Sequence, residues 1–168
     1  MITLKFSENT EFLEKREKCL EYLRKHKVDV GLTSSAPGRS RMLLAIHEHG
    51  APAMRIPARP VIQPALSQPS VRAGMASAMM DACAAANDGD LPAVTSALED
   101  AGRAGVDGIH AYIDKGIPPP NAPVTLSGGW IYNRVAMKGV PVKGKSGTTP
   151  LVDTGQLYND FDYEIREK

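Results

Sequence analysis

The eight residues from Gly139 to Ser146, GVPVKGKS, match the spacing of a phosphate-binding P-loop. In such a loop the backbone amides cradle phosphate oxygens, the lysine reaches the terminal phosphates and the serine holds magnesium. That chemistry needs a strand before the loop and a helix after it. The following residues, GTTPLVDTGQLY, contain two glycines and a proline, which disfavour a helix. We therefore expect no nucleotide-binding site and no cofactor.

A second catalytic motif is LVDTG at residues 151–155, which matches the loop around the catalytic carboxylate of aspartic proteases. A protease of the retroviral type needs most of its β-fold after this loop, whereas only 13 residues follow Gly155. The favoured interpretation is a turn, in which Asp153 bonds to nearby backbone and Gly155 adopts a positive φ before a final strand.

His47, Glu48 and His49 form a cluster of residue types that bind metals. A strand over these residues would place both histidines on one face, where they could be two metal ligands. No third ligand is visible nearby, and the helical spacing H-E-x-x-H is absent. We therefore predict a polar cluster at a strand end, with no metal and no catalytic residue. A metal-dependent hydrolase using His47 and His49 is the alternative.

Length and composition restrict the class of protein. The 168 residues, 42% of them hydrophobic, predict a single domain over residues 1–168 with enough apolar side chains for a core. A formal net charge of +1 gives no general attraction to nucleic acid or to an anionic membrane. Cys19 and Cys83 lack partners at zinc spacing, so both are interpreted as buried thiols in a reducing compartment. No apolar run could span a membrane, which predicts a soluble protein without an export signal.

The first fifty residues are expected to contain one amphipathic helix between strands. Apolar and polar residues alternate over residues 2–6, which predicts a strand with one covered face. Apolar residues then recur at helical spacing to about His26, in a helix that Ser7 or Asn9 can cap. Two further strands are predicted at residues 28–32 and, more hydrophobic and therefore more central, at residues 42–50.

The middle of the chain combines a stiff arm with two helices. Five prolines between residues 51 and 69 predict a rigid, extended arm with one short helical turn at 60–67. A helix is predicted at residues 70–87, and Asp90 can cap a second that runs to about Lys115. Three glycines weaken this second helix by about 1 kcal/mol each unless close packing compensates, which favours a tightly packed helical hairpin.

Residues 117–150 are rich in glycine, proline, serine and threonine and are predicted to form a long, flexible loop without regular structure. Its four basic residues are interpreted as solvated. Alternating Phe161, Tyr163 and Ile165 predict a closing strand. The expected fold class is therefore α+β: a small, mainly antiparallel sheet packed against helices, with a helical hairpin and two long irregular arms.

Three landmarks occur in order along the chain: AIHEHGAPAMRIPARPVIQPAL at residues 45–66, the two helices, and TPLVDTGQLYNDFDYEI at residues 149–165. Together they resemble the tailed-bacteriophage neck and tail-completion family, which includes phage virion morphogenesis proteins and minor tail proteins of the lambda Z type. The shared motifs are an H-E-x-G strand end, an I-P-A-R-P arm and a pLxDTGxL turn into a closing strand.

The resemblance implies a structural virion protein without catalysis, located in the tail or neck and in the host cytoplasm during assembly. Copies would form a ring, expected to be hexameric, through which DNA could pass. Its partners would be the tail tube or tail terminator and head-connector proteins. The arm's Arg59 would either anchor a neighbouring copy or form a salt bridge within its own subunit. The expected assembly interface consists of Ile56, Pro57, Arg59, Pro60, Asp153, Thr154, Gly155 and Leu157.

Overall fold

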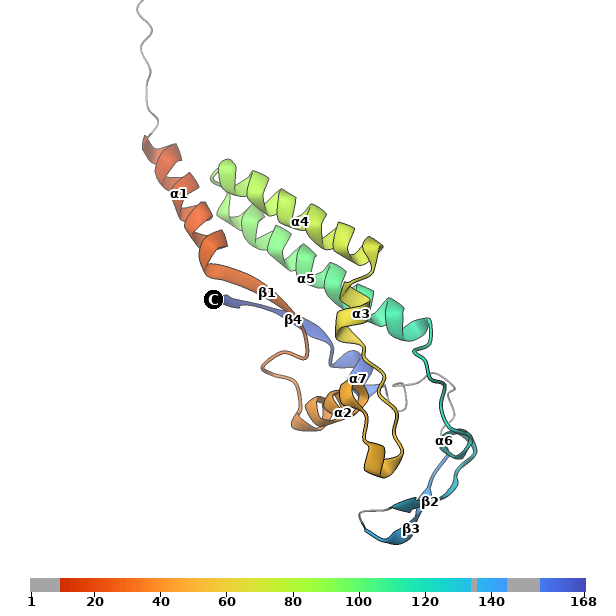
Figure 1. The fold of residues 1–168 in the computed structure, drawn as a ribbon. Helices are drawn as coiled ribbons and strands as arrows, with labels where there is room; N and C mark the ends of the chain where they lie inside the picture. Colours follow the sequence, from red (N-terminus) through yellow and green to blue (C-terminus); the bar gives the residue numbers. More distant parts are fainter. Residues whose placement is uncertain (1–9, 134–135, 145–154) are drawn as a thin grey trace, which may run out of the picture.

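The computed structural model describes residues 10–133, 136–144 and 155–168. Within them the fold is α+β, as predicted, with helices and two separate two-stranded antiparallel ribbons (Figure 1). The strand predicted at residues 2–6 lies outside the described residues. No helix in the described part of the chain is long and apolar enough to cross a membrane.

The predicted N-terminal helix and the strand after it are confirmed. Helix α1 spans Thr10–Lys25 and leads directly into β1, His26–Gly31. Ion pairs at helical spacing, such as Glu11 with Lys15, lie on its exposed side, while Cys19 is buried. Cys83 is exposed, so the prediction that both thiols are buried is wrong for Cys83.

The predicted helical hairpin is also confirmed. Helix α4 spans Pro69–Asn87 and α5 spans Leu91–Asp114, and the two lie side by side in Figure 1. The Asp90 carboxylate caps α5 by accepting a hydrogen bond from the Ala93 amide at 3.0 Å. The buried residues of α4 are Ala78, Ala82 and Ala86. Met79 lies at helical spacing from Ala82 and Ala86 but is exposed.

Strand β4, Asp162–Glu167, confirms the predicted closing strand and pairs antiparallel with β1. Tyr163 lies opposite Val30 in this register, and both side chains contact glycines of α5. A Cβ on Gly102 would lie 2.4 Å from the Tyr163 ring, and one on Gly105 would lie 2.9 Å from Val30. These α5 glycines therefore let the helix approach the ribbon closely.

We expect Gly102→Ala to lower the free energy of unfolding by about 1–3 kcal/mol, because the added methyl group overlaps the Tyr163 ring. The matched control is Gly74→Ala in α4, where the new methyl would meet the nearest atom at an ordinary 3.7 Å. That control should gain about 0.5–1 kcal/mol from helix propensity. Urea denaturation of both variants measures the difference, and equal stabilities would contradict this packing.

The strand predicted at residues 42–50 is wrong, because the chain forms helix α2 over Gly38–His49. Ser40 and Leu44 are both buried and lie one helical turn apart. The Ser40 hydroxyl donates a hydrogen bond to the Asp160 carboxylate, beside the core residue Phe161. A short apolar run fits a strand or a buried helix equally well, and these tertiary contacts select the helix.

The loop predicted at residues 117–150 contains more regular structure than expected. Helix α6 covers Pro123–Ser127, and a β-hairpin follows, formed by β2, Gly129–Asn133, and β3, Lys138–Val142. The hairpin lies at one end of the molecule, far from α4 (Figure 1). The prediction of a structureless loop is therefore wrong for residues 123–133 and 138–142.

The core consists of two clusters that hold these elements together. The first joins α5 to α2, to the short helix α3, Ile62–Leu66, and to α7, Gln156–Asn159. The second joins α1 to the helical hairpin. The main buried residues of the first cluster are Leu44, Val61, Ala65, Ile109, Ile113, Ile117, Leu157 and Phe161.

Candidate functional site

The proline-rich arm folds back on itself instead of extending from the body. Ala51 and Ile56 exchange backbone hydrogen bonds of 2.8 and 3.1 Å around the 3₁₀ turn η1, Pro52–Met54. Gly50 starts this loop at φ 72°, and a Cβ there would lie 2.8 Å from the Ala58 nitrogen. The prediction of an extended arm is therefore wrong, whereas the helical turn expected at 60–67 is confirmed by α3.

Glu48 fixes the return of the arm into α3. Its Oε1 accepts hydrogen bonds from the backbone amides of Val61 at 2.8 Å and Ile62 at 3.0 Å. These amides lie at the start of α3, where a carboxylate also interacts favourably with the helix dipole. The His47 carbonyl accepts a further bond from the Arg59 amide at 2.6 Å. The Glu48 carboxylate therefore has a structural role that the sequence motif did not reveal.

Arg59 connects the arm to the segment that follows α5. Its side chain is only 6% exposed, and Nε and Nη2 donate to the carbonyls of Pro119 at 2.7 Å and Pro120 at 3.0 Å. Burial lowers the pKa of the Arg59 guanidinium, which is still charged at neutral pH. Of the two roles expected from sequence, the internal one fits this geometry, with backbone carbonyls in place of a carboxylate.

The arm and residues 119–122 enclose an open groove of about 520 Å³. Ile56 and Pro57, both expected at the interface, line one side, while Pro119 and Pro120 line the other. Pro60 is exposed, near the groove in sequence but outside its lining. This proline-lined groove can receive an extended apolar segment, because its walls are already stiff before binding.

The C-terminal residues expected at the interface are placed differently. Asp153 and Thr154 lie outside the described residues. Gly155 has φ 77°, as the turn interpretation expects, although the short helix α7 precedes the final strand. Leu157 is 5% exposed and belongs to the core cluster around α5. The structure therefore gives Leu157 an internal contact and does not add it to the groove.

The two candidate metal ligands do not share a face. His47 and His49 are two residues apart on α2, which places them about 200° apart around the helix axis. Within residues 10–133, 136–144 and 155–168, no group of three or more His, Cys, Asp or Glu side chains could hold a metal ion. The shared strand face on which the hydrolase alternative depended is therefore absent.

The P-loop match begins inside a hairpin strand. Gly139 belongs to β3 and pairs with Tyr132 of β2, so this half of the motif is antiparallel strand and not a phosphate-binding turn. Lys145 and Ser146 lie outside the described residues. Residues 147–154, whose composition disfavours the helix that a P-loop needs, lie outside them too.

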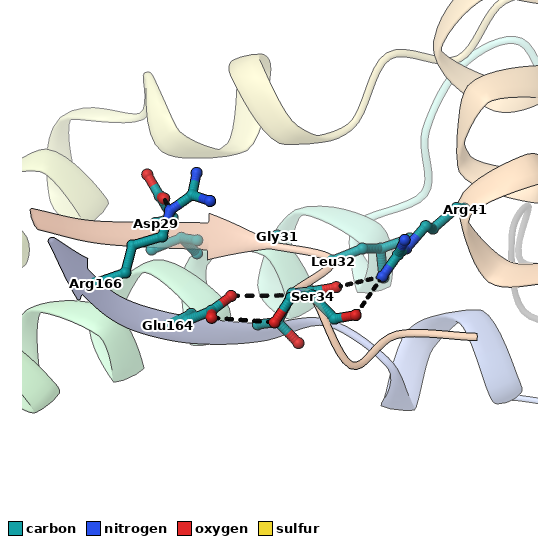
Figure 2. Close-up of a pocket in the computed structure, with 9 residues that line it drawn as sticks. Asp29, Gly31, Leu32, Ser34, Arg41, Glu164 and Arg166 are labelled. Carbon is teal, nitrogen blue, oxygen red and sulfur yellow. Dashed lines mark hydrogen bonds and ion pairs between the residues drawn. The ribbon is translucent and has the colours of Figure 1, made fainter. Parts of the chain in front are cut away.

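A second concavity, of about 330 Å³, lies beside the end of the β1–β4 ribbon (Figure 2). Ser34 donates to both carboxylate oxygens of Glu164, from its hydroxyl at 3.0 Å and its amide at 3.2 Å. Arg41 donates to the carbonyls of Thr33 and Ser34. These bonds fix the loop between β1 and α2, and Figure 2 shows Ser34 between Glu164 and Arg41.

At the other end of this concavity Arg166 forms an ion pair with Asp29 (Figure 2). Partial burial raises the pKa of the Asp29 carboxyl, but hydrogen bonds from Arg166 and Lys27 outweigh that effect and lower it overall. A carboxylate held in its ionised form by two cations is suited to structural pairing and poorly suited to accepting a proton.

No protein-family model, curated protein or solved structure gives a significant match to this chain. Two surfaces of this chain stand out, the groove beside the arm and the exposed β2–β3 hairpin. Among their described residues, neither surface contains a nucleophile paired with a base, whereas both present apolar side chains.

Proposed function

We propose that this chain is a structural protein of a tailed-phage virion, acting as a ring subunit in tail completion or head–tail joining. The observation that carries the proposal is exposed apolar surface on regular structure. Trp130 of β2 is 73% exposed and Tyr132 is 52% exposed. Large apolar side chains gathered on an ordered surface are typical of protein–protein contacts.

The order of the sequence motifs supports the same proposal. The H-E-x-G and I-P-A-R-P segments form the folded loop held by Glu48 and Arg59, and Gly155 lies at the turn before α7. The first two segments therefore have a defined place in the fold, and the third is described from Gly155 onward. The groove lined by Ile56 and Pro57 provides a second surface that suits a peptide segment of a partner.

A closed ring requires head-to-tail contacts, in which two different surfaces of one subunit are complementary. We propose a ring, hexameric in the simplest case, that joins copies of this chain to tail-tube or terminator proteins and to head-connector proteins. DNA would pass through its centre. Such a subunit works by holding neighbours in register and requires no bound cofactor.

The test is to delete the gene from a phage or prophage that encodes it and to examine the particles by electron microscopy. We expect filled heads and separate tails, with joined virions restored by a plasmid copy of the gene. Quantitative mass spectrometry of purified virions should find the protein at a fixed, small copy number. Normal virions in the deletion strain would overturn the proposal.

The alternative of a metal-dependent hydrolase depended on a strand that would bring His47 and His49 to one face. His47 and His49 point in different directions on α2, so the geometric reason for considering them as ligands is gone.

A further inference from the structure

The β2–β3 ribbon is apolar on both faces. Trp130 lies opposite Pro141, and Tyr132 lies opposite Gly139, so all four share one face of the ribbon. The Trp130 ring lies over Gly139, where a Cβ would be 3.4 Å from the ring. The other face carries Ile131, Val140 and Val142, which are half-buried.

An isolated two-stranded hairpin is marginally stable in water and gains stability from packing on one of its faces. Here β2 contacts α6 and one face of the ribbon is half-buried, while Trp130 and Tyr132 remain exposed. Met137, close to the hairpin turn, is 72% exposed, and its sulfur atom lies 3.9 Å from the Tyr132 hydroxyl oxygen. The exposed face is therefore a compact cluster of two aromatic rings and one thioether.

Helix α4 presents a second apolar surface, which the described residues leave uncovered. Its 19 residues include only two charged side chains, Arg72 and Asp81. One side already packs on α5, yet the exposed side is also mainly apolar or small beside Arg72, Ser77 and Asp81, and Met80 is 72% exposed there. A helix with apolar residues on two sides is normally covered on both. The exposed apolar residues of this outward face are Ala73, Ala76, Met79, Met80, Cys83 and Ala84.

The two surfaces lie at opposite ends of the molecule. Figure 1 shows α4 along one end and the β2–β3 ribbon at the other, with the β1–β4 ribbon and α2 between them. The ribbon therefore cannot cover α4 of its own chain. A second copy can bring the two surfaces together, and each copy then offers one surface to each of two neighbours.

Charge complementarity indicates the same pairing. Residues 116–152 contain four lysine and arginine residues and no acidic residue, whereas residues 69–114 contain seven acidic residues and only two basic ones. Lys138 and Lys143 flank or lie in β3, while Asp81 lies on α4 and Asp88 follows its last turn. Opposite potentials favour encounter of the basic ribbon with the acidic helical hairpin and disfavour ribbon-to-ribbon pairing.

We propose that the β2–β3 ribbon of one copy packs on the outward face of α4 of a second copy. Trp130 and Tyr132 contact Met79 and Met80, because thioethers pack favourably against aromatic rings. The basic residues of the ribbon lie beside the acidic residues of the helical hairpin. The contact rests on the proposed ring function and identifies the two surfaces that join its subunits.

The first test compares Trp130→Ala with the wild-type chain by sedimentation and light scattering. We expect subunit association to weaken at least tenfold, because an exposed tryptophan at the centre of a contact is a typical hot spot. Circular dichroism checks folding, which should be unchanged for so exposed a residue. The matched control is Met42→Ala, which should leave association unchanged. Met42 is also an exposed apolar side chain, but it lies on α2, outside both proposed surfaces.

The second test uses the native thiol on α4. Trp130→Cys should form a disulfide with Cys83 of another copy, since Cys83 is exposed on α4 while Cys19 is buried. A ladder of linked chains is expected, in solution and in purified particles, and Cys83→Ala should abolish it. Met42→Cys, as the control, should give no ladder. Mass spectrometry of the linked peptides identifies the pair.

The outcomes separate this contact from the function on which it rests. A ring that is unaffected by Trp130→Ala, and that forms no disulfide between the Trp130→Cys position and Cys83, overturns the proposed contact. The proposed ring function would still stand. Normal rings that fail to join heads or tails when Trp130 is replaced show that the ribbon binds another virion protein, which also overturns the contact. A chain that is monomeric in solution and absent from virions overturns both.

Discussion

Arg59→Ala is expected to lower the free energy of unfolding by about 2–4 kcal/mol. The guanidinium is 6% exposed and donates to the carbonyls of Pro119 and Pro120, sixty residues away in sequence. Hydrogen bonds from a charged donor contribute more than neutral ones, and the buried stem of the side chain adds packing. Alanine removes both, and the segment after α5 loses its attachment to the arm.

Urea denaturation measures the loss, and hydrogen exchange at residues 117–128 reports whether that segment opens before the rest of the chain. Arg59→Lys should lie between wild type and alanine, because an ammonium group cannot reproduce the planar, forked geometry. Arg55→Ala is the matched control, since Arg55 belongs to the same loop but is exposed. Equal stability of the two alanine variants would show that the Arg59 bonds contribute nothing.

The sequence predicts the long helices well because each has several independent signals. Helix α5, for example, has a capping aspartate at Asp90, a proline in its first turn and apolar residues at helical spacing over six turns. The glycines along it are expected to require close packing, and Gly102 and Gly105 do lie close to the β1–β4 ribbon. Local pattern and tertiary packing agree in this part of the chain.

Prediction failed where the deciding contacts are distant in sequence. The run at residues 42–50 fits a strand as well as a helix, and the contacts of Ser40 and Leu44 with residues near position 160 select the helix. The hairpin was missed because the glycines and prolines of residues 117–150 obscured a short alternation around Trp130 and Val140. The hydrogen bonds between β2 and β3 stabilise the hairpin although the local strand propensity is weak.

Side-chain roles at the arm were the least predictable part of the candidate site. The acceptors of Arg59 are backbone carbonyls, which every residue carries. The sequence therefore cannot show which carbonyls Arg59 contacts, and it leaves both roles of Arg59 open. The capping contact of Glu48 with Val61 and Ile62 was hidden for a related reason, since the strand expected there would have directed the carboxylate elsewhere. The five prolines indicated an irregular segment over residues 51–69, but its folded shape and internal bonds required the three-dimensional structure.

Leu157 gives the sharpest contrast between motif and structure. The resemblance placed it at an assembly interface, whereas its side chain is 5% exposed and packs in the cluster that contains Leu44, Ile109 and Phe161. We expect Leu157→Ala to lower the free energy of unfolding by about 2–5 kcal/mol, because the substitution removes buried methyl groups and leaves a cavity. Leu13→Ala is the matched control, since Leu13 is an exposed leucine on α1.

Urea denaturation at a protein concentration where the chain is monomeric measures this effect without a contribution from assembly. The control should change stability by no more than about 0.5 kcal/mol, as exposed substitutions usually do. Light scattering of the folded variant should show unchanged association, because the core position contributes to each subunit before any contact between subunits. A variant with wild-type stability and weakened association would instead place Leu157 at the interface between copies, and the packing of α7 on α5 would have to be revised.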